Sequence, residues 1–474
     1  MTQATIQIED IALEEVFAAQ QKQALQWRTS TAAQRIQLLK ALKTEVEQHE
    51  DALIHALYAD FKKPAEEVKL TELAPFYMEI NHTIKHLHRW MKPKAVANHF
   101  PFLLGKSQIQ YQAKGNVLVI APWNYPFQLS MNPLVTAIAA GNTVMLKPSE
   151  FTPNTSKLIA EIIHKVFDPA QVRVYLGDAE MSKRLLKLPF NHIFFTGSPA
   201  VGREVMRAAA THLADITLEL GGKSPVFIDE SADLLSTAEK LVWGKLLNGG
   251  QTCIAPDYVL VNDAMIPALT DALKTAINTQ YGTTNLNQQQ AAVISLRHYQ
   301  RLKSLLHEAL EQGAQLVTGG QFDDETLRIA PTIISGVNDQ MRIMHEEIFG
   351  PILPVVGVKH SQEAVHYIND HPKPLALYIF SRNDYKNRQI LAQTSSGGSC
   401  INDLVVHITN PDLPFGGINQ SGIGHYHGEA GFRTFSHSRS VFSQFNWFNI
   451  NRFIYPPYTP TKSKLIAWLL KIIK

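Results

Sequence analysis

The residue best suited to covalent chemistry is Cys253, which ends the run Asn248-Gly249-Gly250-Gln251-Thr252-Cys253. The two glycines let the backbone pass close to a substrate or a cofactor. A thiolate at this place is a strong nucleophile if its pKa is lowered or if another group takes the thiol proton. The alternative is a buried structural cysteine, the commoner fate of a lone thiol. We expect that structural role for the second cysteine, Cys400.

A second candidate is Glu219, which ends the apolar run 216–220 just before Gly221 and Gly222. A carboxylate at the end of a buried strand loses water, which raises its pKa toward the range of a general base. A solvated acid at a strand end is the alternative.

These residues need elements to position them, and short apolar runs alternate with helical patterns from Val117 onward. The expected strands are 117–120, 143–146, 172–175, 193–195 and 216–220. Continuous apolar strands separated by helices predict a doubly wound parallel sheet covered on both faces. Ligands bind such sheets at the carboxyl ends of the strands. The loops leaving those ends carry the unusual residues 121–124, 147–150, 196–198 and 219–222.

The pattern of apolar residues in the rest of the sequence predicts helices before this sheet and a second α/β region after Cys253. Helical periodicity covers about thirty residues from Thr31 to Pro64, with a cap at Ser30 or Thr31, and then 66–90. Residues 92–106 are expected to be an extended connector and 107–113 a strand. The second α/β region has expected strands at 259–261, 315–317, 353–356 and 376–380, a helix from Ile266 and a long helix over 291–312.

Composition excludes several classes of protein. A chain of 474 residues is expected to form two domains. The net charge of +2 comes without a basic block, so we expect no nucleic-acid partner. Two cysteines and a polar, acidic N-terminus favour a cytoplasmic enzyme without disulfides, and no apolar run is long enough to span a bilayer. We expect no metal: HExxH and CxxC are absent, and the histidines at 82, 86, 88, 425 and 427 are expected to be ordinary surface or hydrogen-bonded groups.

Seven segments, in this order and spread over residues 30 to 440, resemble those of the aldehyde dehydrogenases. They are Pro122-Trp123-Asn124-Tyr125-Pro126, Lys147-Pro148-Ser149-Glu150, Phe195-Thr196-Gly197-Ser198, Leu218-Glu219-Leu220-Gly221-Gly222-Lys223, Gly249-Gly250-Gln251-Thr252-Cys253, Glu346-Glu347-Ile348-Phe349-Gly350-Pro351 and Leu413-Pro414-Phe415-Gly416-Gly417. The chain is most similar to the class 3 and fatty aldehyde dehydrogenase branch, through the shorter N-terminus, Asn402-Asp403, His407, Tyr426-His427-Gly428 and Thr434-Phe435-Ser436-His437. It departs from that branch at Ile418-Asn419-Gln420-Ser421, where a Gly-Asn-Ser run is more usual.

The resemblance implies oxidation of an aldehyde to a carboxylic acid with NAD, or alternatively NADP. Cys253 would attack the carbonyl to give a thiohemiacetal, and the thioester formed after hydride transfer would be hydrolysed with Glu219 as general base. Asn124 and the Cys253 backbone N–H would hold the oxyanion, and one such donor is worth about 3 kcal/mol. The implied cofactor-binding residues are Lys147, Glu150, Gly197, Ser198, Gly202, Gly221, Glu347 and Phe349.

The cofactor residues divide by the part of the dinucleotide they would contact. The turn from Gly197 to Gly202 would hold the pyrophosphate at a helix N-terminus. Lys147 and Glu150 match positions that hold the adenine ribose, while Glu347 and Phe349 match those that place the nicotinamide ribose and ring. Glu346 is expected to be an ordinary element-end charge.

Two other functions remain open on the sequence. A CoA-acylating enzyme would pass the thioester to CoA, but such relatives often lack the acid at the Glu219 position. A non-catalytic protein on the same fold would be expected to lose Cys253 or Glu219, and both are present.

The expected division is a cofactor-binding domain (1–91 and 107–219), a catalytic domain (220–410), a bridging arm that pairs two subunits into a homodimer (92–106 and 411–445), and a C-terminal tail (446–474). In the tail, an apolar helix is expected from Leu465, with Lys464, Lys471 and Lys474 on one side. Six aromatic residues precede it: Phe445, Trp447, Phe448, Phe453, Tyr455 and Tyr458. The tail either packs on its own domain or its partner, or it caps the substrate entrance or lies on a membrane surface, which would favour medium- to long-chain aliphatic or aromatic aldehydes.

Overall fold

A six-stranded sheet forms the centre of the first domain. The computed structural model describes residues 13–99, 105–282, 289–444 and 450–474. The strand order is β17-β7-β6-β3-β4-β5. Five strands are parallel: β3 (Asn116–Ile120), β4 (Thr143–Lys147), β5 (Val172–Val174), β6 (His192–Gly197) and β7 (Asp215–Leu220). The chain runs outward from β3 through β4 and β5 and then returns to β6 beside β3, so the predicted doubly wound sheet is confirmed and its switch point lies between β3 and β6.

Helices cover this sheet in layers. Those next to it are α1 (Leu13–Trp27), α6 (Gln128–Ala140), α7 (Pro153–Val166), α8 (Ala179–Leu185) and α9 (Pro199–His212). An outer layer, formed by α2 (Ala32–Glu47), α3 (Glu50–Phe61) and α5 (Ala74–Trp90), packs on α6 and α7. The expected cap at Thr31 is confirmed, since Thr31 and Gln34 form a reciprocal capping box.

Both predicted N-terminal helices are interrupted. The thirty-residue helix is two helices, because the chain leaves helical geometry at His49 between α2 and α3. The second helix contains the short α4 (Ala65–Val68), the π-helical turn η1 (Lys69–Leu73) and then α5, with Pro75 in the first turn of α5. The chain is helical on both sides of Pro75, and the irregular hydrogen-bond ladder of the adjoining π-turn accommodates the missing N–H.

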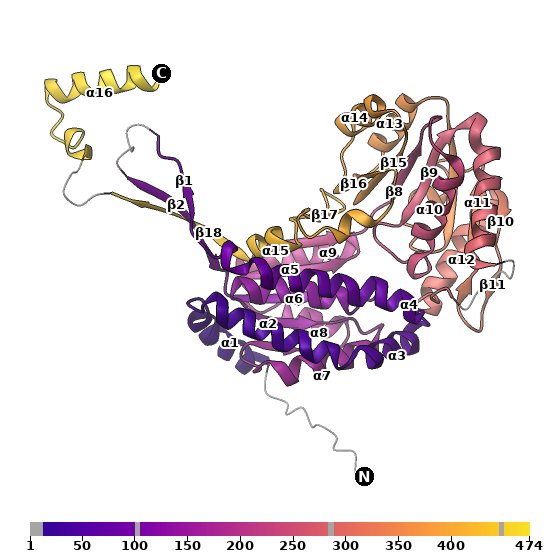
Figure 1. Cartoon of the computed structure of the whole chain (residues 1–474), viewed down its shortest axis with the longest axis horizontal. Coiled ribbons are helices and arrows are strands. Elements are labelled where there is room, and N and C mark those ends of the chain that lie inside the picture. Colours follow the sequence, from indigo (N-terminus) through magenta and orange to yellow (C-terminus); the bar gives the residue numbers. More distant parts are fainter. Residues whose placement is uncertain (1–12, 100–104, 283–288, 445–449) are drawn as a thin grey trace, which may run out of the picture.

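The second domain is built on a seven-stranded sheet with the order β10-β13-β14-β9-β8-β15-β16. The strands are β8 (Ser224–Ile228), β9 (Pro256–Asn262), β10 (Gln315–Thr318), β13 (Thr332–Ser335), β14 (Ile352–Val358), β15 (Ala376–Phe380) and β16 (Gly398–Ile401), with β10 antiparallel at one edge. Its helices are α10 (Leu234–Leu246), α11 (Ile266–Tyr281), α12 (Leu296–Glu311), α13 (Ser361–Asp370) and α14 (Asp384–Gln393), and β11 (Phe322–Asp323) and β12 (Arg328–Ile329) form a small hairpin. The two domains lie side by side (Figure 1).

The predicted helix over 291–312 is wrong at its start, because α12 begins at Leu296. Backbone groups before it bond elsewhere: the N–H of Ala292 donates to the carbonyl of Phe61, and the N–H of Ile294 donates to the Gln251 side chain. Ser295 caps the helix through its hydroxyl. Tertiary hydrogen bonds therefore replace a helical turn that the apolar pattern favoured.

A three-stranded antiparallel arm projects from the first domain (Figure 1). It pairs β1 (Lys94–Val96) and β18 (Ser436–Ser443) with β2 (Lys106–Ala113). Strand β2 thus belongs to the arm sheet, although the sequence placed it with the cofactor-binding range. Conversely, β17 (Gly422–Ile423) pairs with β7, and α15 (Gly428–Thr434) packs on α5 and α6. The domain ranges themselves stay a prediction.

The predicted tail helix forms as α16 (Pro460–Ile473), which lies at the far end of the arm and buries none of its residues (Figure 1). It therefore does not pack on the domains of its own chain. Phe445, Trp447 and Phe448 lie outside the described residues. Among those described, no helix combines the length and the apolar character needed to cross a bilayer.

Candidate active site

The turn that carries Cys253 is fixed by close backbone approaches. Asn248, Gly249 and Gly250 all have positive φ, at 55°, 62° and 78°. A Cβ on Gly250 would lie 2.3 Å from the carbonyl oxygen of Gly350. Only glycine fits there, so this turn and the Gly350 backbone are held in contact.

Hydrogen bonds join this turn to the loop after β3. The Asn124 side-chain amide donates to the carbonyl of Gln251 at 3.0 Å, and the Asn248 amide donates to the carbonyl of Asn124 at 2.8 Å. The hydroxyls of Tyr125 and Thr252 share a hydrogen bond of 2.6 Å. Asn124 is therefore placed beside the cysteine turn, although the two come from different domains.

The thiol of Cys253 is held in its protonated form. Burial, and then the charges of Glu347 and Glu219, raise its pKa to about 12. The carboxylate of Glu219 is buried, with both oxygens lacking a hydrogen-bond partner among the described residues, and burial raises its pKa well above the usual value. A base with a raised pKa therefore lies near a thiol that needs one.

Two cavities meet at these residues. The first, of about 240 Å³, is almost entirely apolar and is named here the apolar cavity. The second, of about 260 Å³, extends toward β6 and α12 and is named the second cavity. Both are lined by Leu129, Thr196, Glu219, Leu220 and Cys253. The cysteine and the glutamate thus stand where a molecule in one cavity would face a molecule in the other.

The predicted cofactor residues gather around the second cavity. It is lined by Gly197, Ser198, Gly221, Glu347 and Phe349, together with Asn124. Ser198 caps α9, whose N-terminus carries the partial positive charge that favours a pyrophosphate. Gly202, in the first turn of α9, lets that helix pack close to Leu220, because a Cβ there would lie 2.7 Å from the Leu220 side chain.

Two further observations fit a dinucleotide. A Cβ on Gly221 would lie 2.1 Å from an oxygen of Glu347, so the glycine makes room for this carboxylate. Glu347 is half-buried, desolvation raises the pKa of its carboxyl to about 8, and its buried Oε1 lacks a partner among the described residues. Lys147 and Glu150 lie apart from the cavity lining, at the carboxyl end of β4, where they pair at 2.6 Å. The residues present therefore fit NAD(P) lying across the carboxyl edge of the sheet.

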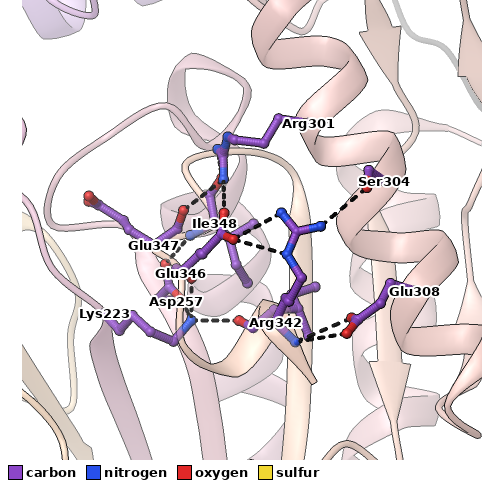
Figure 2. A network of polar contacts seen from close by, with 10 residues as sticks. Lys223, Asp257, Arg301, Ser304, Glu308, Arg342, Glu346, Glu347 and Ile348 are labelled. Carbon is purple, nitrogen blue, oxygen red and sulfur yellow. Dashed lines mark hydrogen bonds and ion pairs between the residues drawn. The ribbon is translucent and has the colours of Figure 1, made fainter. Parts of the chain in front are cut away.

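A polar network that the sequence did not predict holds the Glu347 loop (Figure 2). Arg301 on α12 donates to the carbonyls of Glu347, at 3.1 Å, and Ile348, at 2.6 Å. Lys223 bonds Asp257 and the carbonyls of Ile343 and Glu346, and Asp257 accepts the N–H of Ile348 at 2.9 Å. Lys223 comes directly after the Gly221-Gly222 segment, but Arg301 stands in an ordinary amphipathic helix without a local signal.

The outer part of this network keeps Glu346 in the ordinary role expected for it. Its carboxylate pairs at 2.9 Å with the guanidinium of Arg342, which also donates to the Ser304 hydroxyl, and the backbone N–H of Arg342 donates to Glu308 (Figure 2). These side chains are partly exposed, so the pairing tethers the loop rather than entering a cavity.

An aromatic group closes the second cavity beside Phe349, which has a positive φ of 50°. The Trp123 ring meets Phe349 edge-on at 5.3 Å between centroids, and the His298 ring lies 5.3 Å from that of Trp123. His298, like Arg301, was not predicted from the sequence as a site residue.

The remaining sequence candidates do not join the site. Cys400 is buried, as expected, with its Sγ 3.1 Å from Nδ1 of His407. The rings of His82 and His86 lie 4.5 Å apart between centroids, with their planes tilted by 43°. Within the described residues, no group of three or more histidine, cysteine, aspartate or glutamate side chains could hold a metal ion.

The fold and these cavities define a class: two-domain α/β oxidoreductases with a cysteine between the dinucleotide-type sheet and a substrate cavity. Comparison of the chain with known proteins then gives the family. The aldehyde dehydrogenase family profile matches residues 4–441, and the chain belongs to this family. Aldehyde dehydrogenase family 3 member B1 of Bos taurus is 42% identical over 446 residues, covering 94% of each chain. A 4,4'-diaponeurosporen-aldehyde dehydrogenase of Staphylococcus aureus is 41% identical over 415 residues, 87% of this chain and 90% of that protein.

Solved structures of aldehyde dehydrogenases have the same fold as this chain. The substrate-bound state of Staphylococcus aureus AldH matches with a TM-score of 0.92 at 38% identity, covering 97% of this chain and 99% of that one. A Mycobacterium tuberculosis aldehyde dehydrogenase complexed with NAD⁺ matches with a TM-score of 0.82 at 27% identity, covering 90% of each. The expected resemblance, including that to class 3 enzymes, is confirmed, and the chain is an NAD(P)-dependent aldehyde dehydrogenase.

Proposed function

We propose that this enzyme oxidises medium- to long-chain aliphatic or aromatic aldehydes through a thioester on Cys253, with Glu219 as general base and NAD as the preferred cofactor. The observation that carries the proposal is the meeting of an apolar cavity and a dinucleotide-type cavity at these two residues.

The first step needs the Cys253 proton to leave. Because the thiol pKa is raised to about 12, little thiolate exists at neutral pH, and an adjacent base must accept the proton as Sγ attacks the carbonyl carbon. Glu219 lines both cavities and has two free carboxylate oxygens among the described groups. The oxyanion that develops would be held by the side-chain amide of Asn124 and the N–H of Cys253.

The cofactor supplies the acceptor for the hydride that leaves the thiohemiacetal carbon. The groups that would hold it are the α9 N-terminus at Ser198, the Glu347 carboxylate and the Lys147–Glu150 pair. Glu150 can accept bonds from ribose hydroxyls, whereas its charge would repel a 2′-phosphate, which favours NAD over NADP.

The thioester can either be hydrolysed to the acid or passed to CoA, and the presence of Glu219 favours hydrolysis. After passing the thiol proton to solvent, Glu219 would take a proton from the attacking water, and the Cys253 sulfur would leave as the thiolate. The enclosed setting that raises the Glu219 pKa also suits this role, because a base is most effective when its pKa is near the working pH.

The apolar cavity supports the substrate class. Its wall includes Leu70, Trp243, Leu247, Ile254 and Val406, so an alkyl chain or a ring would be buried against hydrocarbon. Each buried methylene would contribute about 0.8 kcal/mol. The relative named for 4,4'-diaponeurosporen-aldehyde is consistent with an apolar substrate.

The arm and tail support a homodimer. The arm sheet ends in two edge strands, β1 and β18, which could pair with a second subunit. Helix α16 leaves Trp468, Leu470, Ile472 and Ile473 exposed at the end of this arm. We propose that this apolar surface either caps the partner's substrate entrance or lies on a membrane surface in the cytoplasm.

A chain-length series tests the proposal. kcat/KM should climb over several carbons from short to long linear aldehydes, and removal of residues 460–474 should flatten the climb while leaving short aldehydes unaffected. The same profile with and without the tail would make α16 a structural element, and a fall in kcat/KM with every added carbon would refute the assignment to long aldehydes. Sedimentation showing a monomer or a tetramer would contradict the dimer.

A further inference from the structure

A cluster of three charged residues, two fully buried and one half-buried, lies beside the cysteine turn and outside the linings of the two cavities. It consists of Lys63, Glu67 and Glu72, which come after α3 and are named here the Lys63 cluster. Lys63 Nζ donates to Glu72 at 2.9 Å, and both side chains are fully buried. The same ammonium group lies 4.0 Å from the centroid of the Tyr125 ring. This segment therefore places a desolvated ion pair against the loop that carries Asn124.

The two carboxylates of the cluster reach the two parts of the active site separately. Glu72 accepts the backbone N–H of Gln128 at 2.9 Å, at the start of α6 and four residues after Asn124. Glu67 accepts the backbone N–H of Asn248, the first residue of the cysteine turn. The cluster is thus a second connection between the Asn124 loop and the Cys253 turn, in addition to the hydrogen bonds between the two.

A π-helical turn sets the relative directions of the two glutamates. The turn η1 spans Lys69–Leu73, so Glu67 precedes it and Glu72 lies within it. Side chains five residues apart point about 140° apart on a regular α-helix, whereas the wider π-turn brings them closer to one face. With this geometry Glu67 bonds Asn248 while Glu72 bonds Lys63 and Gln128. Two residues of the same turn, Leu70 and Thr71, line the apolar cavity. Such π-turns are frequent at functional sites.

Burial of this ion pair is not explained by stability alone. Replacing a buried pair by apolar residues of similar volume is often neutral or stabilising, whereas buried charges can specify one arrangement of their surroundings. Within the described part of the chain, the hydrogen bonds from the cluster to other segments end on the backbone N–H of Gln128, four residues after the oxyanion donor, and on that of Asn248, five residues before the nucleophile.

We propose that the Lys63 cluster positions the Cys253 turn against Asn124, with Glu67 as the positioning residue for the turn itself. Loss of the Glu67 acceptor frees the Asn248 peptide, and the turn shifts relative to the amide that holds the oxyanion. A displacement of about 1 Å at a reacting group can cost 10²-fold in rate. The effect falls on kcat, because the second cavity is built from other elements. This inference rests on the proposed roles of Cys253 and Asn124.

The test compares Glu67→Leu, Glu67→Gln and Glu66→Ala in the full-length enzyme. Glu67→Leu keeps the volume but removes the acceptor, and its kcat with a short aldehyde should fall about 10- to 100-fold with the KM for NAD within twofold. Glu67→Gln keeps an oxygen that can accept the Asn248 N–H and should recover kcat to within about threefold of the wild type. Glu66 is exposed on the same short helix and serves as the matched control, with unchanged kinetics.

Coupling to Asn124 separates positioning from general damage. Glu67→Leu should cost little further activity in an Asn124→Ala background, since both act on the oxyanion; additive losses would overturn the proposal, as would a wild-type kcat for Glu67→Leu. If Glu67→Leu does not fold, Glu67→Asp, which withdraws the acceptor by one methylene, takes its place, with kcat expected to fall at least about fivefold; a wild-type kcat for Glu67→Asp would overturn the proposal. Cys253→Ala distinguishes failure of this inference from failure of the proposed function. If Cys253→Ala is inactive while the Glu67 variants have normal kcat, the positioning role of Glu67 is wrong and the catalytic role of Cys253 stands.

Discussion

Replacing Glu219 by glutamine should make the Cys253 thiol more acidic and the enzyme slower at the same time. The charge of Glu219 is one of the causes that raise the thiol pKa to about 12, after burial and Glu347, so its removal lowers that pKa. At pH 8 a thiol with a pKa of 12 is a thiolate in only about one molecule in 10⁴. The variant should hold more thiolate yet lack the base, and general-base catalysis is typically worth 10²–10⁴-fold.

Two assays detect these opposite changes. Alkylation of Cys253 by iodoacetamide, measured from pH 7 to 11, should be faster at each pH in Glu219→Gln than in the wild type, because the variant holds more thiolate. Steady-state NADH production should fall at least about 100-fold. The first equivalent of NADH should still form, at a reduced rate, because the larger thiolate fraction partly replaces the base in the attack, whereas nothing replaces it in hydrolysis.

The pH dependence carries a defined sign. Because burial raises the Glu219 pKa, the basic carboxylate becomes populated as pH rises through that value, so kcat of the wild type should increase with pH in this window. The glutamine variant should lose this rising limb. Glu204→Gln, on the exposed face of α9, is the control. A kcat within threefold of the wild type, or slower alkylation of Cys253 in the variant at the same pH, would refute this role of Glu219.

Three further predictions concern the nucleophile and the cofactor. Cys253→Ala should abolish turnover and leave NAD binding, measured by titration, within about twofold, since the second cavity is otherwise intact; residual turnover that disappears with Cys400→Ala would contradict the assignment. Gly221→Ala should raise the KM for NAD at least about tenfold, because its Cβ would meet the Glu347 carboxylate at 2.1 Å; an unchanged KM would show that Glu347 can move away freely. Glu150→Gln should raise kcat/KM for NADP relative to NAD by removing a charge that repels the 2′-phosphate, and a clear NADP preference in the unmodified enzyme would refute this.

The sheet of the first domain could be predicted because each strand is a continuous apolar run between helices. The runs at 117–120 and 143–146 match β3 and β4 to within one residue. Errors arose where tertiary partners outweigh local pattern. The segment 291–295 looks helical, but its N–H groups bond Phe61 and Gln251. Similarly, the π-turn at Lys69–Leu73 is invisible in a helical periodicity, although it decides which way Glu67 and Glu72 point.

For the site, motif order located Cys253, Glu219 and Asn124, and the structure brings the three together. Sequence could not supply Arg301, because its partners are backbone carbonyls of a loop some forty-six residues later. Nor could it show that the thiol pKa is raised rather than lowered, since this depends on the enclosure created by two domains. Side chains that bond backbone groups of distant loops are thus the part of the site that only the structure reveals.

We expect the oxidised substrate to be carried on the sulfur of Cys253 as a thioester. Glu219→Gln incubated with NAD and a medium-chain aldehyde should accumulate this thioester, and peptide mass spectrometry can locate it after rapid acid quenching. We predict the acyl mass on the peptide that contains Cys253, its absence from the peptide with Cys400, and its release by hydroxylamine. An acyl group on Cys400, or full NADH formation without acylation of Cys253, would contradict the account.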